Sequence, residues 1–109
     1  MTTVTVLYNG ARIVGFRAKG HAGYAEHGED IVCAAVSAIT QTALIGITEN
    51  IACPCRVDLS DGKLELIIDD SAESEKREKA ELILGVMLSG LRSIESQYDN
   101  YLKVKKKEV

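Results

Sequence analysis

Two tight-turn signals, each set between two short β-prone runs, restrict the fold of this chain more than any other feature. Asn9-Gly10 separates residues 3–8 from residues 12–19, and Asp61-Gly62 separates residues 56–59 from residues 63–68. Such dipeptides supply the positive φ angles that tight hairpin turns demand. The sequence therefore predicts two antiparallel hairpins.

Apolar residues at helical spacing predict two helices. The first is expected over residues 31–50, with Asp30 as its N-cap, and Pro54 then returns the chain to extended structure. Its apolar stripe consists of Val32, Val36, Ile39, Ala43 and Ile47. The second helix is expected over residues 74–97. Its predicted buried face consists of Ala80, Leu84, Met87, Leu91, Ile94 and Tyr98.

A short final strand over residues 101–105 completes the element order ββαββαβ. This order predicts an α+β fold in which two helices pack on one face of a largely antiparallel sheet. A chain of 109 residues can bury a core without disulfides or metals. Because no linker interrupts the pattern, residues 1–109 are expected to form a single domain.

Composition argues against several classes of partner. The formal net charge is −3, whereas nucleic-acid modules are usually basic, so no direct nucleic-acid contact is expected. A lysine cluster at residues 103 and 105–107 is expected to be a solvated tail rather than a nucleic-acid contact. The start of the chain does not resemble a secretory signal. No uninterrupted apolar run is expected to be long enough for a bilayer, so no membrane partner is expected. The three cysteines are predicted to be reduced thiols in the cytoplasm.

The segment from Gly20 to Cys33 has features of a functional site rather than of a purely structural connection. It is glycine-rich and longer than a structural connection needs, with His21 near one end and Cys33 at the other. With Asp30 as N-cap, Cys33 falls in the first turn of its helix, where unpaired amides favour a thiolate. His21 could then act as general base, and the amides could stabilise an oxyanion. This mechanism requires no metal and no cofactor.

Plainer interpretations exist for each of these residues. A free cysteine such as Cys33 is often a small buried apolar residue. Strand alternation places His21 on the face of Arg17 and Lys19, away from a packed helix, although Gly20 allows a departure from that geometry.

Four neighbouring features are also open to more than one interpretation. Asp30 is predicted to cap the helix, with orientation of His21 as its alternative role. Ser37 lies one turn beyond Cys33 and either contributes to the site or bonds back to its own helix. Gly23 and Gly28 would let the loop move over a peptide, and Tyr24 belongs to the same loop. His27 is expected at the loop surface, with substrate contact as the alternative.

Cys53-Pro54-Cys55 invites a zinc interpretation together with the histidines and Cys33. Only one residue separates the two thiols, however, and zinc sites usually space paired cysteines by two or more. Buried thiols at the start of a strand are the simpler prediction.

The run Gly20-His21-Ala22, followed by Gly28-Glu29-Asp30-Ile31-Val32-Cys33-Ala34-Ala35-Val36-Ser37, closely resembles the ribosomal-processing cysteine protease family, Prp. The resemblance covers the chain in length and element order. It implies an endopeptidase that removes the N-terminal extension of protein twenty-seven of the large ribosomal subunit, with His21 and Cys33 as its dyad. It also implies a homodimer, cleavage after bulky aromatic residues, and a flexible loop over the site. The alternative is a non-enzymatic ribosome-associated module that captures an anion at the helix N-terminus.

Overall fold

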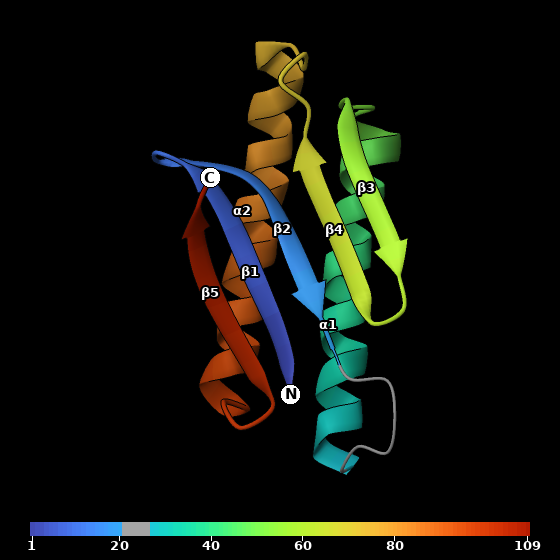
Figure 1. The fold of residues 1–109 in the computed structure, drawn as a ribbon, viewed down its shortest axis with the longest axis vertical. Helices are drawn as coiled ribbons and strands as arrows, with labels where there is room; N and C mark the ends of the chain where they lie inside the picture. The colour runs from blue at the N-terminus through green and yellow to red at the C-terminus, as the bar shows by residue number, and fades with distance from the viewer. Residues whose placement is uncertain (21–26) are drawn as a thin grey trace.

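A five-stranded sheet carries two helices on one face (Figure 1). The computed structural model describes residues 1–20 and 27–109. The strands are β1 (Thr2–Asn9), β2 (Arg12–Lys19), β3 (Cys55–Ser60), β4 (Lys63–Ile68) and β5 (Leu102–Glu108), and the helices are α1 (His27–Ile45), its π-helical continuation η1 (Gly46–Asn50), and α2 (Ser74–Gln97). The sheet order is β3-β4-β2-β1-β5, and only the β1–β5 pair is parallel. The predicted ββαββαβ order and fold class are confirmed.

Both predicted hairpins form, and the second turn lies at the predicted Asp61-Gly62, where Gly62 has a φ of 68°. The first turn is shifted by one residue. Asn9 is still paired with Arg12 as the last residue of β1, so the turn residues are Gly10, with a φ of 64°, and Ala11. Glycine alone supplies the left-handed conformation there, so the prediction that Asn9 shares in it is wrong.

The core lies between the sheet and the two helices. The predicted apolar stripe of α1 and η1 faces inward, and so does most of the predicted face of α2. Tyr98 is the exception, since it follows the end of α2 and is 42% exposed. The helical spacing that placed Tyr98 in the core does not apply beyond Gln97, where the helix ends.

The first helix begins earlier than predicted. It starts at His27, so Asp30 lies within its first turn and is not the N-cap, and Cys33 lies in the second turn. A carboxylate is favourable both at an N-cap and in the first turn, because both positions meet the positive end of the helix dipole. Asp30 is therefore compatible with a helix that begins at His27 and with one that begins at Ile31, and the sequence alone does not distinguish the two.

The C-terminal lysines are in a strand rather than a tail. β5 pairs in parallel with β1 over its whole length, from Thr2 opposite Leu102 to Tyr8 opposite Glu108. Because β5 is an edge strand, its lysines remain exposed, and the ammonium of Lys106 lies 5.3 Å from the centre of the Tyr8 ring. Lysines on an edge discourage pairing with other chains.

The helical stretch from Asp30 to Asn50 departs from the expectation that no apolar run is long enough for a bilayer. Over these 21 residues, with a mean hydropathy of 1.8, it is long and apolar enough to cross a membrane by length and composition alone. In the fold its inward face supplies the core, where Val32, Val36 and Ile47 are buried. Core helices pass the same composition test, so the stretch is weak evidence for a membrane span.

Candidate active site

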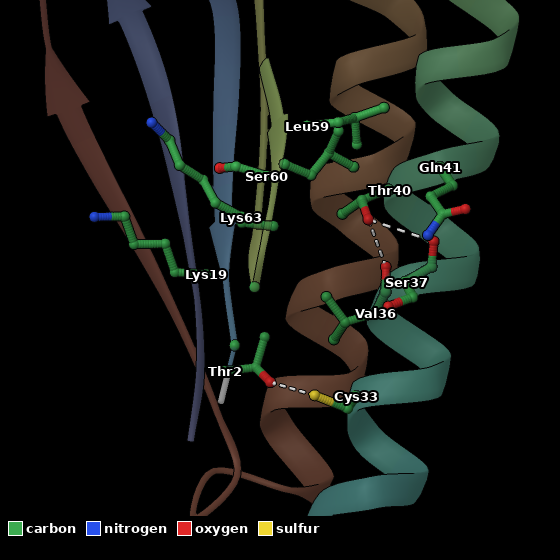
Figure 2. Close-up of a pocket in the computed structure, with 14 residues that line it drawn as sticks. Thr2, Lys19, Cys33, Val36, Ser37, Thr40, Gln41, Leu59, Ser60 and Lys63 are labelled. Atoms are coloured by element: carbon green, nitrogen blue, oxygen red, sulfur yellow. Dashed lines mark hydrogen bonds between the residues drawn. The ribbon is translucent and has the colours of Figure 1, made fainter. Parts of the chain in front are cut away.

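A cavity of about 320 Å³ opens between α1 and the neighbouring ends of the strands (Figure 2). The side chains that α1 contributes are Cys33, Val36, Ser37, Thr40 and Gln41. The strands and their ends contribute mainly Thr2, Gly20, Leu59, Ser60, Gly62 and Leu64. In Figure 2, Leu59 extends toward α1, whereas the ammonium groups of Lys19 and Lys63 point away from it. The wall near α1 is therefore a mixture of apolar groups, hydroxyls and one thiol.

Cys33 is half-buried, and its sulfur contacts the first residue of β1. Cys33 Sγ lies 3.1 Å from Thr2 Oγ1, at hydrogen-bond distance, and either atom can donate. Thr2 is itself only 4% exposed, and its amide donates to the Tyr101 carbonyl at 2.9 Å. The hydroxyl is thus fixed by the sheet, and it limits where the thiol can point.

Gly20 brings the end of β2 against the same sulfur. A Cβ built on Gly20 would lie 3.4 Å from both Cys33 Sγ and Thr2 Oγ1. The Gly20 amide donates to the Gly62 carbonyl at 3.0 Å, which ties the end of β2 to the β3–β4 turn. A Cβ on Gly62 would in turn lie 2.8 Å from the Gly20 oxygen. The two glycines allow a close approach that side chains would prevent.

Of the two predicted supporting residues, the structure places Ser37 at the cavity and Asp30 away from it. Ser37 lines the cavity together with Cys33. Asp30 is exposed in the first turn of α1 and does not line it. The hydrogen bond back to the helix backbone that was considered for Ser37 is made by its neighbour Thr40, whose hydroxyl donates to the Val36 carbonyl at 2.8 Å.

Several predicted residues lie outside the described part of the chain. They are His21, Gly23 and Tyr24. Of His27 and Gly28 the structure describes only the backbone, which forms the start of α1. The predicted place of Cys33 among the first three helical positions is wrong, because the second turn already donates its amides within the helix. Unpaired amides at the helix start therefore do not surround the sulfur as expected.

The other two cysteines lie at the far end of the molecule's first helical segment, after η1. Cys53 is buried and Cys55 is half-buried, and both are free thiols. Burial raises the pKa of Cys53, with partial opposition from Arg77 and Lys76. Burial also raises the pKa of Cys55, and Cys53 and Asp69 add to that increase. The predicted burial is confirmed for Cys53, whereas Cys55, the first residue of β3, is only half-buried. No metal-binding group of His, Cys, Asp or Glu occurs in residues 1–20 and 27–109.

Sequence reasoning missed Thr2, Gln41 and Leu59 as parts of the cavity wall. Gln41 continues the face of α1 that carries Cys33 and Ser37, so helical spacing could have indicated it. Thr2 and Leu59 come from distant parts of the chain, and only the folded sheet brings them to Cys33. No local pattern marks them.

Comparison with known proteins places this geometry in context. The profile of the family described as cysteine protease Prp matches residues 1–103. The chain is 33% identical over 94 residues to the ribosomal processing cysteine protease Prp of Bacillus subtilis (strain 168), with 84% of each protein covered. Its fold is similar to that of the essential ribosomal processing protease Prp from S. aureus in complex with a substrate peptide, with a TM-score of 0.86, 27% identity, and coverage of 98% and 100%. The S. aureus protease with a covalently linked product peptide gives a TM-score of 0.81 and 29% identity, again covering 98% and 100%.

Proposed function

This chain belongs to the cysteine protease Prp family, and from that premise we propose that residues 1–109 act as one endopeptidase domain with Cys33 as nucleophile and His21 as general base. Its substrate is the N-terminal extension of protein twenty-seven of the large ribosomal subunit. Membership in a family of cysteine proteases favours this function over a non-enzymatic ribosome-associated module. The observation that carries the assignment is the free thiol of Cys33 in the wall of a cavity large enough for a side chain of the substrate.

The position of Gly20 supports the pairing of Cys33 with His21. A Cβ built on Gly20 would lie 3.4 Å from the sulfur. His21 follows Gly20 directly in the sequence, and this adjacency supports its pairing with the Cys33 thiol as general base.

The reaction then proceeds by acyl transfer. His21 accepts the thiol proton, and the thiolate of Cys33 attacks the carbonyl carbon of the scissile bond. The tetrahedral oxyanion collapses to a thioester as the C–N bond breaks, and His21 gives its proton to the leaving amine. Water attacks the thioester and His21 takes up the water proton. The C–S bond then breaks, the peptide leaves as a carboxylic acid, and His21 returns its proton to the sulfur of Cys33. These steps use no metal and no cofactor.

The proposal gives roles to further residues in and near the cavity wall. The Thr2 hydroxyl, 3.1 Å from the sulfur, positions the thiol. Ser37 contacts the substrate, and Val36 and Leu59 hold the aromatic side chain that precedes the cleaved bond. Asp30 favours the start of α1 through the helix dipole. Gly23 and Tyr24 belong to the segment that covers the substrate, and His27 and Gly28 follow it at the start of α1.

An apolar hollow between the outer faces of α1 and α2 supports assembly as a homodimer. It has a volume of about 670 Å³ and is lined by Ile39, Leu82 and Val86 among others. Leu82 is 69% exposed and Val86 is 65% exposed, which is unusual for large apolar side chains. A second copy of this chain would cover both. Sedimentation velocity should show a dimer that Val86→Glu converts to a monomer, and a monomeric wild-type protein would contradict this assignment.

The thiol chemistry also fits a reducing compartment, and we assign the protein to the cytoplasm. All three cysteines are free, and thiols persist in the cytoplasm because glutathione and thioredoxin keep them reduced.

Peptide cleavage tests the proposed function directly. Purified protein should cut a peptide that contains an aromatic pair followed by a small residue, and mass spectrometry should detect both products. Cys33→Ala should reduce the rate by at least about a thousandfold, as removal of a nucleophile does in other proteases. His21→Ala should reduce the cleavage rate similarly, while circular dichroism shows an intact fold. Cys55→Ala is the matched control and should cleave normally. Undiminished cleavage by Cys33→Ala would overturn the assignment.

A further inference from the structure

The two edges of the sheet differ in how they meet solvent (Figure 1). The β5 edge carries lysines, which discourage strand pairing. The β3 edge carries Val57, which is 41% exposed, and Leu59, which is 69% exposed. All residues of β3 after Cys55 are exposed. The β3 edge is therefore long, apolar in part and uncovered by any residue in the described ranges.

The pairing of β3 with β4 determines which backbone groups face this edge. Ser60 and Lys63 flank the two-residue turn, so they form a hydrogen-bonded pair, and such pairs alternate along an antiparallel ladder. The Asp69 amide donates to the Pro54 carbonyl at 2.9 Å. This bond lies an even number of residues from the Ser60–Lys63 pair, as the alternation requires. The backbone groups of Val57 and Leu59 consequently point outward, where they are free to pair with another strand.

The same two residues turn their side chains toward the helices. Val57 lies opposite Leu66 and Leu59 lies opposite Leu64, and both partners are buried on the helix-facing side of the sheet. Figure 2 shows the Leu59 side chain extending into the space beside α1. Leu59 also lines the cavity that contains Cys33. The free edge of β3 and the candidate nucleophile thus belong to one continuous surface.

We propose that the peptide substrate binds as an additional strand on the free edge of β3, with its backbone paired to Val57 and Leu59 and its scissile bond carried toward Cys33. This inference rests on the proposed protease function. A peptide bond presented for attack must be extended, and strand addition holds it so through main-chain hydrogen bonds. Because side chains alternate along a strand, every second substrate residue would face the cavity side.

N-methylation of the substrate, one peptide bond at a time, tests this arrangement on the wild-type protein. Each methyl group removes one N–H donor. If the peptide adds as a strand, kcat/KM should fall about five- to tenfold at alternate positions and change little at those between, since only alternate amides face β3. Loss at successive positions without alternation, or no loss along the peptide, would overturn the proposal.

A variant of β3 gives the reciprocal test. Val57→Pro removes an amide that faces outward, so it leaves the ladder with β4 intact. The KM of Val57→Pro should rise about five- to tenfold with kcat unchanged. The control Val57→Ala keeps the amide, so its KM should rise less. Equal KM values for the two variants would contradict strand addition. Thermal unfolding checks that both fold, and the N-methyl series decides the question if Val57→Pro does not.

Failure of this inference can be distinguished from failure of the protease assignment. If the wild-type protein cleaves in a Cys33-dependent manner but shows no alternation, only strand addition is overturned. If the wild-type protein does not cleave, binding of the same N-methylated peptides to the Cys33→Ala protein is measured by fluorescence anisotropy. Alternating affinities would then support the β3 edge as a peptide site, and uniform affinities would overturn it.

Discussion

Cys33 lies near the start of the long helical segment formed by α1 and η1, whereas Cys53 and Cys55 lie just beyond its end. The surroundings of these thiols differ in kind. Cys33 lies in a cavity wall, with its sulfur 3.1 Å from a buried hydroxyl. Cys53 and Cys55 belong to the core or contact it, where burial raises the pKa of both thiols. The comparison shows that one residue type occupies two kinds of surroundings, and the proposed function assigns chemistry only to the thiol in the cavity wall.

Alkylation should reveal the largest difference between the two regions. Iodoacetamide near neutral pH should modify Cys33 about a hundredfold faster than Cys53 or Cys55, because a thiolate is the reactive form and the buried thiols have raised pKa values. Labelling of Cys53 and Cys55 should increase only as the pH rises through those raised values. Peptide mapping by mass spectrometry measures the rates, and equal rates at the three sites would remove the distinction.

The Thr2 hydroxyl sharpens the comparison, since neither Cys53 nor Cys55 is in contact with a corresponding hydroxyl in the described structure. Thr2→Val preserves the shape of the side chain but removes the hydrogen bond to the sulfur. We expect kcat to fall about tenfold with little change in KM, as for loss of a bond to a charged group. Thr3→Val is the control from the same strand. A change in KM alone would indicate that Thr2 contacts substrate instead.

Cys53→Ala tests the other side of the comparison. Removal of a buried sulfur should lower the free energy of unfolding by about 1 kcal/mol. The value of kcat/KM should remain that of the wild type, because Cys53 lies outside the cavity. Urea denaturation and peptide cleavage measure the two effects. A loss of activity at unchanged stability would show that the second region takes part in catalysis.

The smallest effect concerns Asp69, which lies near Cys55. Hydrogen bonds from Ser71, including one from its amide at 2.9 Å, hold the pKa of Asp69 below its ordinary value. A lowered pKa in the folded state stabilises the protein above the unfolded-state pKa, and this contribution is lost as the pH falls through the folded value. Asp69→Asn should therefore be less stable at neutral pH and converge with the wild type below about pH 3. A constant difference at all pH values would contradict this.

Local signals in the sequence were sufficient for much of the fold. The Asp61-Gly62 turn and the bounds of α2 follow from turn chemistry and apolar spacing, and the structure confirms both. The start of α1 could not be fixed, since Asp30 suits two positions relative to the helix dipole. The length of β5 depends on its pairing with β1, which is distant in sequence.

The site was predictable only where its residues are close in the chain. Cys33 and Ser37 share one helix face, and the structure places both in the cavity wall. Thr2 reaches Cys33 across 31 positions of sequence, and Leu59 reaches the cavity through the β3–β4 hairpin. Such contacts depend on the sheet register, which no local pattern encodes.

The most direct test of the central claim is to trap the acyl-enzyme. Wild-type protein is mixed with substrate peptide, quenched in acid and digested, and mass spectrometry locates the adduct. A thioester of the amino-terminal product fragment should appear on Cys33, and it should be absent from the Cys33→Ala protein. Cleavage that proceeds with the adduct on Cys53 or Cys55, or with no adduct on any cysteine, would contradict the account.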